Sequence, residues 1–558
     1  MRITKVALTN FKAFKETQVI ELAPVTLLFG PNSAGKSSIL LALFYVQQIL
    51  SKRQVNPQRI EALGDKLVGG FKDLVNGKDL KKSITIKIDY DKKEAIGSSY
   101  TRTQDFMSEL RESPELPIVM NSPSADSTKG AVELEIAWSE VHKTAFVSKY
   151  TVWLNDIKVG SITSDEGLKN PLITFLDFFH PLLEPDNNDD WIKEFCGSTG
   201  TKVHSEYRPE LQDLIDENGD WMEECFGASG VQSQFHYLIA DQFPVGVNAD
   251  VGALPNLGKE LTTTLSLETD AAEKILNETL SEVFVSPLDN LLKILNDSIC
   301  LGPLRAVPDT TYSPNPYPRQ SDWFNGIAAW DTLAKNDRTL LSSVNSWIAA
   351  DNRLSLGYEI ALKASSKLSG DDKISSGVAL SFLNQKLAKI EPGVNVGKFT
   401  EYDRVSWEYK NELWDINQEI LVSPSEIGVG VSQLLPLVVA ALAAKKGIVA
   451  CEQPELHVHP RVQVAIGDLF TQVDGEPNFL IETHSEHLIL RLLKRVRQTT
   501  ENDLPEDIKP VSKESISIVY LEPSSLGVTA KRIEIDEDGE FTTRWPHGFF
   551  SERRDEVM

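Results

Sequence analysis

The sequence predicts an α/β protein that also carries an antiparallel β region and a mainly helical insertion, and three observations lead to this prediction. First, residues 25–38 join a short apolar run, a glycine-containing loop and the start of an apolar helix. Second, segments 83–90, 132–138 and 145–154 alternate apolar and polar residues with period two, which indicates half-exposed antiparallel strands. Third, between residues 171 and 299 this alternation fades and apolar residues recur at near-helical spacing. We therefore expect a mixed sheet with flanking helices, an antiparallel β subdomain and a helical insertion.

The length of the chain, 558 residues, exceeds what one compact core of ordinary size holds. We expect an N-terminal lobe at 1–170, the helical insertion at 171–299 and a C-terminal lobe at 300–558. The insertion is either a subdomain that fills out the fold or a docking region for a partner, and we favour the docking region.

Charge and cysteine content restrict the function classes. The net charge of −25 repels nucleic acid globally, so any such contact needs a local basic patch. The four cysteines lie far apart without a C-x-x-C pair, which argues against a disulfide framework and suits a reducing cytoplasm. We find no apolar run of membrane-spanning length and expect no membrane partner.

Residues 30–37 (GPNSAGKS) match the phosphate-loop pattern G-x-x-x-x-G-K-[ST]. Gly30 and Gly35 let the backbone turn with its N–H groups facing inward, and these donors form an anion site with the helix N-terminus that follows. Lys36 supplies a charge for the outer phosphates and Ser37 a hydroxyl for Mg²⁺. The expected ligands are ATP and Mg²⁺, and the candidate nucleotide-binding residues of this loop are Asn32, Gly35, Lys36, Ser37 and Ser38.

Two further patterns lie near the other end of the chain. In residues 425–436 two glycines precede Ser432 at an apparent helix start, where we expect the Ser432 side chain to cap the helix N-terminus. Residues 448–455 form an apolar strand that ends in Glu452, Gln453, Pro454 and Glu455. The next strand, 478–483, is followed by a histidine and a serine.

Together these motifs resemble the ATPase heads of the SMC and RecF class. The start of the chain looks like the opening of such heads: a first strand, an N-F-K-x-F turn at residues 10–14, a second strand and the phosphate loop. The OLD family and its antiviral relatives share this opening. The resemblance covers about 1–90 and 420–558 and implies an ABC-type head without a long coiled-coil arm. The full OLD nucleases continue into a Toprim domain, for which we judge the remaining chain too short.

The resemblance also implies roles for individual residues. Ser432 lies in the signature motif, which in this class contacts the γ-phosphate bound by the opposite subunit. Glu452 occupies the position at which the class has its Mg²⁺-coordinating carboxylate. Gln453 stands where most members have the catalytic glutamate, and an amide orients water but does not accept its proton. Either Glu455 takes the role of base, or hydrolysis is slow. His484 matches the switch histidine that reaches the γ-phosphate.

Several residues keep two interpretations. Lys12 is a contact for the base and α-phosphate, or a solvated hairpin lysine. Arg305, in a G-P-L-R segment, faces phosphate or the other subunit, or forms a surface salt bridge. The histidines near the nucleotide could also suggest zinc, although their P-E-L-H-x-H-P context is familiar in OLD-like ATPases; they are His457, His459, His484 and His487. The basic helix after Ser485 either compensates the helix dipole or forms a nucleic-acid or partner patch; its basic residues are Arg491, Lys494, Arg495 and Arg497.

The subgroup most similar in these motifs is the ATPase subunit of Septu-type antiviral defence systems, including the retron-associated forms. That resemblance implies a homodimer with ATP sandwiched between two heads, assembly into a higher oligomer, and a separate nuclease partner of HNH type. Nucleic acid would then be bound indirectly, through the complex. A RecF-like DNA-repair clamp is one alternative, and an ATP-dependent scaffold or antitoxin that restrains a toxic partner is another.

Overall fold

The computed structural model describes residues 1–64, 66–93, 95, 97–100, 123–166, 168, 171–177, 180–183, 245–264, 270–309, 311–335, 337–366, 375–379, 407–525 and 527–546. The chain divides into two compact units. The first contains residues 1–20, 45–58 and 68–296, and the second contains residues 21–44, 59–67 and 297–558. The regions that we expected at 1–170, 171–299 and 300–558 remain predictions about how the chain is organised.

The first unit is built on a seven-stranded sheet with the order β2-β1-β4-β5-β6-β7-β8. Its strands alternate buried and less buried residues because only one face of each strand packs inward. All neighbouring pairs from β1 to β8 are antiparallel, which confirms the strands expected from period-two alternation. The bounds are β1 Arg2–Thr9, β2 Gln18–Glu21, β4 Ile84–Asp91, β5 Lys129–Ser139, β6 Thr144–Leu154, β7 Ile157–Thr163 and β8 Leu172–Leu176.

Two helices of this unit pack on that sheet. The Tyr150 hydroxyl in β6 donates to the Phe284 carbonyl oxygen at 3.0 Å, and the Phe284 ring lies so close to Gly160 in β7 that a Cβ there would meet it at 2.5 Å. Within 171–299, where we expected helical spacing, the described residues form α8 Asp270–Phe284 and α9 Ser286–Asn296. Residues 184–244 of this region lie outside the described residues. The smaller elements are α2 Phe71–Leu74, η2 Asn76–Lys78, α4 Pro123–Asp126, β9 Ala249–Val251 and β10 Leu254–Pro255.

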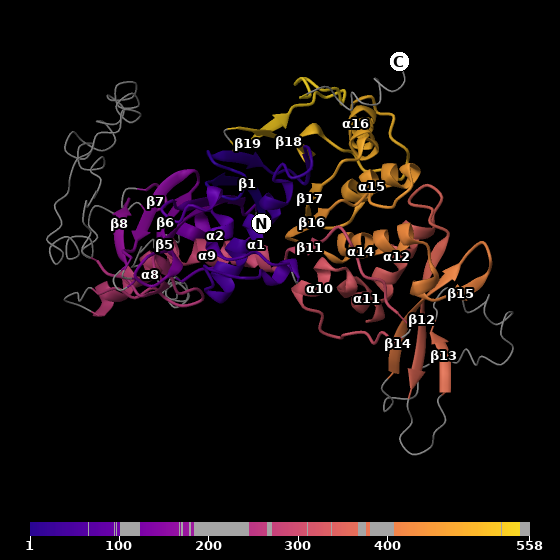
Figure 1. Ribbon diagram of the computed structural model, residues 1–558, viewed down its shortest axis with the longest axis horizontal. Helices are drawn as coiled ribbons and strands as arrows, with labels where there is room; N and C mark the ends of the chain where they lie inside the picture. Colours follow the sequence, from indigo (N-terminus) through magenta and orange to yellow (C-terminus); the bar gives the residue numbers. More distant parts are fainter. Residues whose placement is uncertain are drawn as a thin grey trace, which may run out of the picture. The chain divides into compact units, whose positions relative to one another are not determined.

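The second unit is built on a six-stranded mixed sheet with the order β11-β16-β17-β3-β18-β19. Figure 1 labels β11, β16, β17, β18 and β19 of this sheet. The first five strands are parallel and β19 is antiparallel to β18. Every residue of β3, β16 and β17 is buried, as expected for parallel strands covered on both faces. The α/β fold class with mixed and antiparallel sheets is thus confirmed. The strands are β3 Val25–Phe29, β11 Ile299–Leu301, β16 Ile448–Glu452, β17 Asn478–Glu482, β18 Ile516–Ser524 and β19 Gly527–Ile533.

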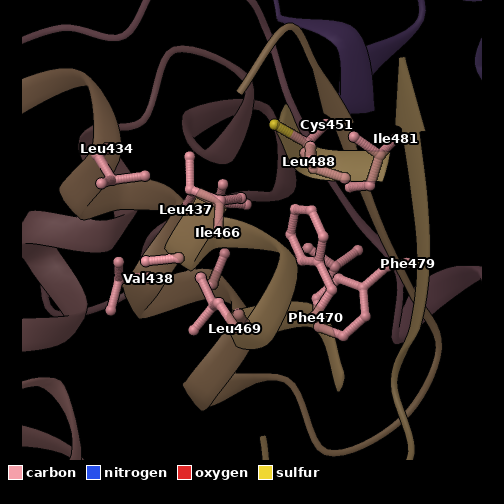
Figure 2. Packing of buried hydrophobic residues seen from close by; sticks show 14 of the residues in the cluster. Leu434, Leu437, Val438, Cys451, Ile466, Leu469, Phe470, Phe479, Ile481 and Leu488 are labelled. Carbon is pink, nitrogen blue, oxygen red and sulfur yellow. The ribbon is translucent and has the colours of Figure 1, made fainter. Parts of the chain in front are cut away.

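Helices of the second unit share one apolar core with this sheet. Figure 2 shows the cluster between α14, α15 and the strands, where Phe470 of α15 meets Phe479 of β17 with ring centroids 4.9 Å apart. Burial of each large apolar side chain contributes about 1.5–3 kcal/mol. This packing places α14 in the same core as α15, β16 and β17. The helical elements are α1 Lys36–Lys52, η1 Glu61–Leu63, α10 Gln320–Phe324, α11 Ile327–Ala334, α12 Arg338–Ala349, η3 Pro424–Glu426, α14 Val429–Ala443, α15 Pro460–Gln472, α16 Glu486–Thr500 and η4 Lys513–Ser515.

An additional antiparallel sheet in the second unit has the order β13-β12-β14-β15. The sequence analysis did not predict it. Its strands are β12 Tyr358–Ser366, β13 Ser375–Ala379, β14 Trp407–Asp415 and β15 Ile420–Val422. In the part of the chain that is described, no helix combines the length and the apolar character needed to cross a membrane.

Candidate nucleotide site

The phosphate loop connects β3 to α1 with the backbone that its glycines permit. Gly30 has φ 138° and Gly35 has φ 89°, both in the region that favours glycine. A Cβ on Gly30 would lie 2.5 Å from the Leu521 carbonyl oxygen of β18, so no larger residue fits there. The turn expected from residues 30–37 is therefore present.

Lys36, the first residue of α1, lies folded back over this loop. Its side chain is only 3% exposed, and Nζ donates to the carbonyl oxygens of Gly30 at 2.9 Å and Pro31 at 3.0 Å. Burial lowers the pKa of Lys36, while the carboxylates of Glu482 and Glu455 act in the opposite direction. Phosphate oxygens would add further negative charge beside this buried ammonium, whose nearest carboxylate oxygen, Glu482 Oε1, lies 3.8 Å away.

Ser37 donates its hydroxyl hydrogen to Glu482 Oε2 at 2.6 Å, within the short range of charge-assisted O–H···O⁻ bonds. The other oxygen, Glu482 Oε1, lies 3.8 Å from Lys36 Nζ. The sequence analysis missed Glu482. A signal was available, because an acid ends this apolar strand just as Glu452 ends the other one.

Glu452 ends β16, and its Cα partner on β17 is Glu482. Burial raises the pKa of Glu452, and the neighbouring Glu482 carboxylate acts in the same direction. Lys66 opposes this rise, since its Nζ lies 3.6 Å from Glu452 Oε1. Two carboxylates and the Ser37 hydroxyl thus come from neighbouring strands and the adjoining helix. Oxygen donors of this kind fit Mg²⁺, which takes its remaining ligands from water and phosphate.

Gln453 and Glu455 lie in the turn after β16 and engage different parts of the end of β17. Gln453 has φ 47°, unusual for a residue with a side chain, and its N–H donates to the Glu482 carbonyl oxygen at 2.8 Å. Glu455 accepts from the His484 N–H at 2.7 Å and from Thr483 Oγ1 at 2.9 Å. Both carboxylate oxygens of Glu455 therefore hold the turn that presents His484.

His484 follows β17 after one residue, Thr483, and its side chain is exposed. Partial loss of solvent and the nearby Lys36 charge lower the pKa of His484, although Glu455 and Glu482 oppose the shift. A neutral imidazole can both donate and accept a hydrogen bond. Within the described residues no three His, Cys, Asp or Glu side chains are placed to hold a metal ion, and this covers the histidines considered for zinc.

Ser432 does not cap a helix, and that expectation is wrong. Helix α14 begins at Val429 with Gly428 as the N-cap residue, so Ser432 lies one turn inside the helix. It is 2% exposed, and its Oγ donates to the Val429 carbonyl oxygen at 2.9 Å. The first turn of the helix contains Gly430, where a Cβ would meet the His457 carbonyl oxygen at 2.8 Å. The contact of Ser432 with an opposite subunit's nucleotide remains a prediction.

Arg305 is not on the surface, so the expected surface salt bridge is wrong, while its contact with phosphate or with the other subunit remains a prediction. The residue is buried, and its guanidinium donates to the carbonyl oxygens of Gln433 at 2.9 Å and Glu452 at 3.0 Å, and to Cys451 Sγ at 3.0 Å. The Gln433 side chain in turn bonds the Arg305 backbone through both N–H and C=O. Arg305 thus connects α14 to the end of β16.

Lys12 belongs to the other compact unit. It has φ 50°, its N–H donates to the Leu74 carbonyl oxygen at 2.6 Å, and its own carbonyl oxygen accepts from Asn76 Nδ2 at 2.7 Å. These bonds shape the N-F-K turn. The contact of Lys12 with the nucleotide remains a prediction, as do those of the exposed Asn32 and of Ser38, whose N–H bonds the Gly35 carbonyl oxygen.

The basic residues of α16 are mostly paired with acids. Arg495 is buried and bonds Asp468 through Nε at 2.7 Å and Nη2 at 2.9 Å. Arg491 Nη1 lies 3.6 Å from the same carboxylate, and Arg497 pairs with Glu540. Three of the four basic residues thus have protein carboxylates as partners, which does not favour a nucleic-acid patch here.

The family model of the AAA ATPase domain matches residues 1–164 and 361–489, more than half of the chain. The chain therefore belongs to the family of AAA ATPase domains, and the phosphate-loop site described above is that of an ATPase.

A curated relative, the DNA replication and repair protein RecF of Desulforamulus reducens, is 40% identical over 45 residues. That match covers 8% of this chain and 12% of the relative's length. Among solved structures, an SMC head bound to the C-terminal winged-helix domain of ScpA aligns over 96% of this chain and 98% of its own, with 9% identity and a TM-score of 0.36. The SMC head domain from Thermotoga maritima aligns over 96% and 100%, with 10% identity and a TM-score of 0.33.

Proposed function

We propose that this chain is the ATP-binding and ATP-hydrolysing subunit of a bacterial antiviral defence complex, in which paired heads control a separately encoded nuclease. The observation that carries the ATP part of the proposal is the convergence of Lys36, Ser37 and Glu452 with Glu482 at the carboxyl ends of β3, β16 and β17. In α/β proteins with a parallel sheet, ligands bind at the carboxyl ends of the strands. The bound group would be Mg²⁺ with ATP, whose outer phosphates Lys36 neutralises and whose metal Ser37 and Glu452 hold. The defence role comes from the resemblance of the ordered motifs to Septu-type ATPases.

The amide at Gln453 supports slow turnover. A carboxamide in this position orients water without taking its proton. Both oxygens of Glu455 already accept hydrogen bonds from the turn at Thr483 and His484. A slow ATPase spends long periods with nucleotide bound, which suits a switch in which ATP binding is the signal.

The ATP site is tested by Lys36→Ala. We expect the variant to lose binding of a fluorescent ATP analogue in Mg²⁺, because the outer phosphates lose their buried cation. The exposed Lys446 provides the matched control, and Lys446→Ala should bind as the parent does. Equal affinity of the parent and Lys36→Ala would refute the site.

Head pairing needs an exposed position on α14, because an arginine at the buried Ser432 would disrupt packing instead. Val429, at the start of α14, is 58% exposed. We expect Val429→Arg to bind ATP normally but to prevent the ATP-dependent dimer seen by light scattering. Val141→Arg, at a residue 70% exposed in the first unit, is the control. A Val429→Arg protein that still dimerises with ATP would refute pairing through this helix end.

The partner is tested by co-expression with the genes that neighbour this one. An HNH nuclease gene alongside this one is the expected outcome. Its product should copurify with this chain, and replacement of exposed residues within 171–299, such as Lys259 and Glu260, should abolish the complex. Repair genes in the neighbourhood would favour the RecF-like clamp, for which the short RecF match speaks. Such a clamp binds duplex DNA by itself in ATP. Fluorescence anisotropy with a labelled DNA duplex separates the defence complex from the RecF-like clamp. ATP-dependent binding of the duplex by this chain alone would overturn the proposal that nucleic acid is bound only through the complex.

A further inference from the structure

Glu482 has no role in any of the motifs that mark the phosphate-loop site, yet it makes the closest side-chain contact to Ser37. Strand β17 lies between β3 and β16, with Glu482 opposite Leu28 of β3 on one side and Glu452 of β16 on the other. A carboxylate at the end of β17 is therefore one strand nearer to the loop than the carboxylate at the end of β16. The described contacts agree: Glu482 bonds Ser37, whereas Glu452 pairs with Lys66.

We propose that Glu482 is the carboxylate that orients the Ser37 hydroxyl for Mg²⁺, so that the end of β17 as well as that of β16 prepares the metal position. This inference rests on the proposed ATP site. A serine hydroxyl has one hydrogen and two lone pairs. Because Ser37 donates that hydrogen to Glu482 at 2.6 Å, its lone pairs remain available to a cation.

The electrostatic surroundings support this role. Glu482 is buried, and a buried carboxylate is costly unless charge and hydrogen bonds compensate it. Lys36 Nζ at 3.8 Å from Oε1 and the Ser37 hydroxyl at Oε2 supply that compensation. One carboxylate thus touches both phosphate-loop side chains, the one that meets phosphate and the one that meets the metal. Glu482 acts through Ser37 and is a positioning residue.

Two substitutions separate charge from hydrogen bonding at this position. Glu482→Gln removes the charge and keeps a carbonyl oxygen that can accept from Ser37, while Glu482→Leu removes both. Groups that orient metal ligands typically change metal affinity by about 10–100-fold when they are mutated. The readout is the affinity for a fluorescent, non-hydrolysable ATP analogue in Mg²⁺ divided by its affinity in EDTA.

We expect this ratio to fall about 10-fold in Glu482→Gln and further in Glu482→Leu. In EDTA both variants should bind the analogue at least as tightly as the parent, because a negative charge 3.8 Å from Lys36 Nζ is gone. A general loss of structure would weaken binding in both conditions and leave no such contrast. Glu540→Gln, which removes an exposed carboxylate paired with Arg497, is the control and should keep the parental ratio.

The outcomes are distinguishable. A parent protein that binds the analogue in neither condition refutes the ATP site itself. A parent with Mg²⁺-enhanced binding, whose Glu482 variants keep that enhancement within about twofold, refutes only the role of Glu482. If Glu482→Leu does not fold, the nearly isosteric Glu482→Gln decides the question alone.

Discussion

Replacement of Arg305 by methionine should destabilise the second unit strongly, although Arg305 lies outside the helices and strands, between β11 and α10. Its guanidinium is 3% exposed and donates to two backbone carbonyl oxygens, those of Gln433 and Glu452, and to Cys451 Sγ. Methionine fills a similar volume but donates no hydrogen bond. The Gln433 side chain keeps its two hydrogen bonds to the backbone of residue 305 in the parent protein and in Arg305→Met.

The size of the effect follows from these contacts. Hydrogen bonds from a charged donor contribute about 1.5–3 kcal/mol each, so the two carbonyl bonds together contribute about 3–6 kcal/mol. Removal of a buried charge recovers part of this, since its desolvation no longer opposes folding. We therefore expect a net destabilisation of about 2–4 kcal/mol.

The assay is hydrogen exchange measured by mass spectrometry on peptides from β16 and α14, which reports the stability of these elements separately from the rest of the chain. Arg338→Met removes an exposed arginine from the start of α12 and should change stability by less than about 0.5 kcal/mol. Arg305→Lys keeps the charge but not the planar fork that reaches two carbonyl groups, and should fall between the parent and Arg305→Met. Equal protection of these peptides in Arg305→Met and Arg338→Met would refute the reasoning.

Three further predictions concern the site and its support. Gln453→Glu should raise steady-state phosphate release, by up to about 10²-fold, because a base replaces an amide beside the attacking water; loss of turnover in Glu455→Gln with no gain in Gln453→Glu would instead assign the base to Glu455. Gly30→Ala should weaken nucleotide binding at least tenfold, because its Cβ would lie 2.5 Å from a β18 carbonyl oxygen and its φ of 138° is strained for alanine; unchanged affinity in a fluorescence titration would contradict this. Arg495→Met should destabilise the α15–α16 pair by about 3–5 kcal/mol, since it leaves the buried Asp468 without its bidentate partner; urea unfolding with an unshifted midpoint would show the pair to be dispensable.

The local sequence pattern predicted the structure correctly where neighbouring residues in the chain determine it. The phosphate loop is specified by Gly30, Gly35 and the apolar runs on either side, and these residues adopt the predicted turn. Period-two alternation located β4 to β6 because one face of each strand packs inward. Asn155 and Asp156, with φ of 49° and 68°, form the turn of the hairpin between β6 and β7.

The local sequence pattern did not predict the role of a residue whose contacts lie far along the chain. The start of α14 was misplaced at Ser432, since the helix begins at Val429 and its first turn contains Gly430, whose close approach to the His457 backbone is not visible in sequence. The surface role expected for Arg305 was wrong because its partners are carbonyl oxygens at Gln433 and Glu452, which carry no side-chain signature.

By itself, therefore, the sequence determined the fold class, the phosphate loop and the order of the motifs, all of which depend on short-range spacing and apolar periodicity. The tertiary structure decided which carboxylate meets Ser37. Glu482 lies 445 residues further along the chain, and it reaches Ser37 only because β17 is inserted between β3 and β16. Strand order in a parallel sheet is set by packing of the whole unit, so the sequence shows an acid at the end of both β16 and β17 but does not tell which of the two reaches Ser37.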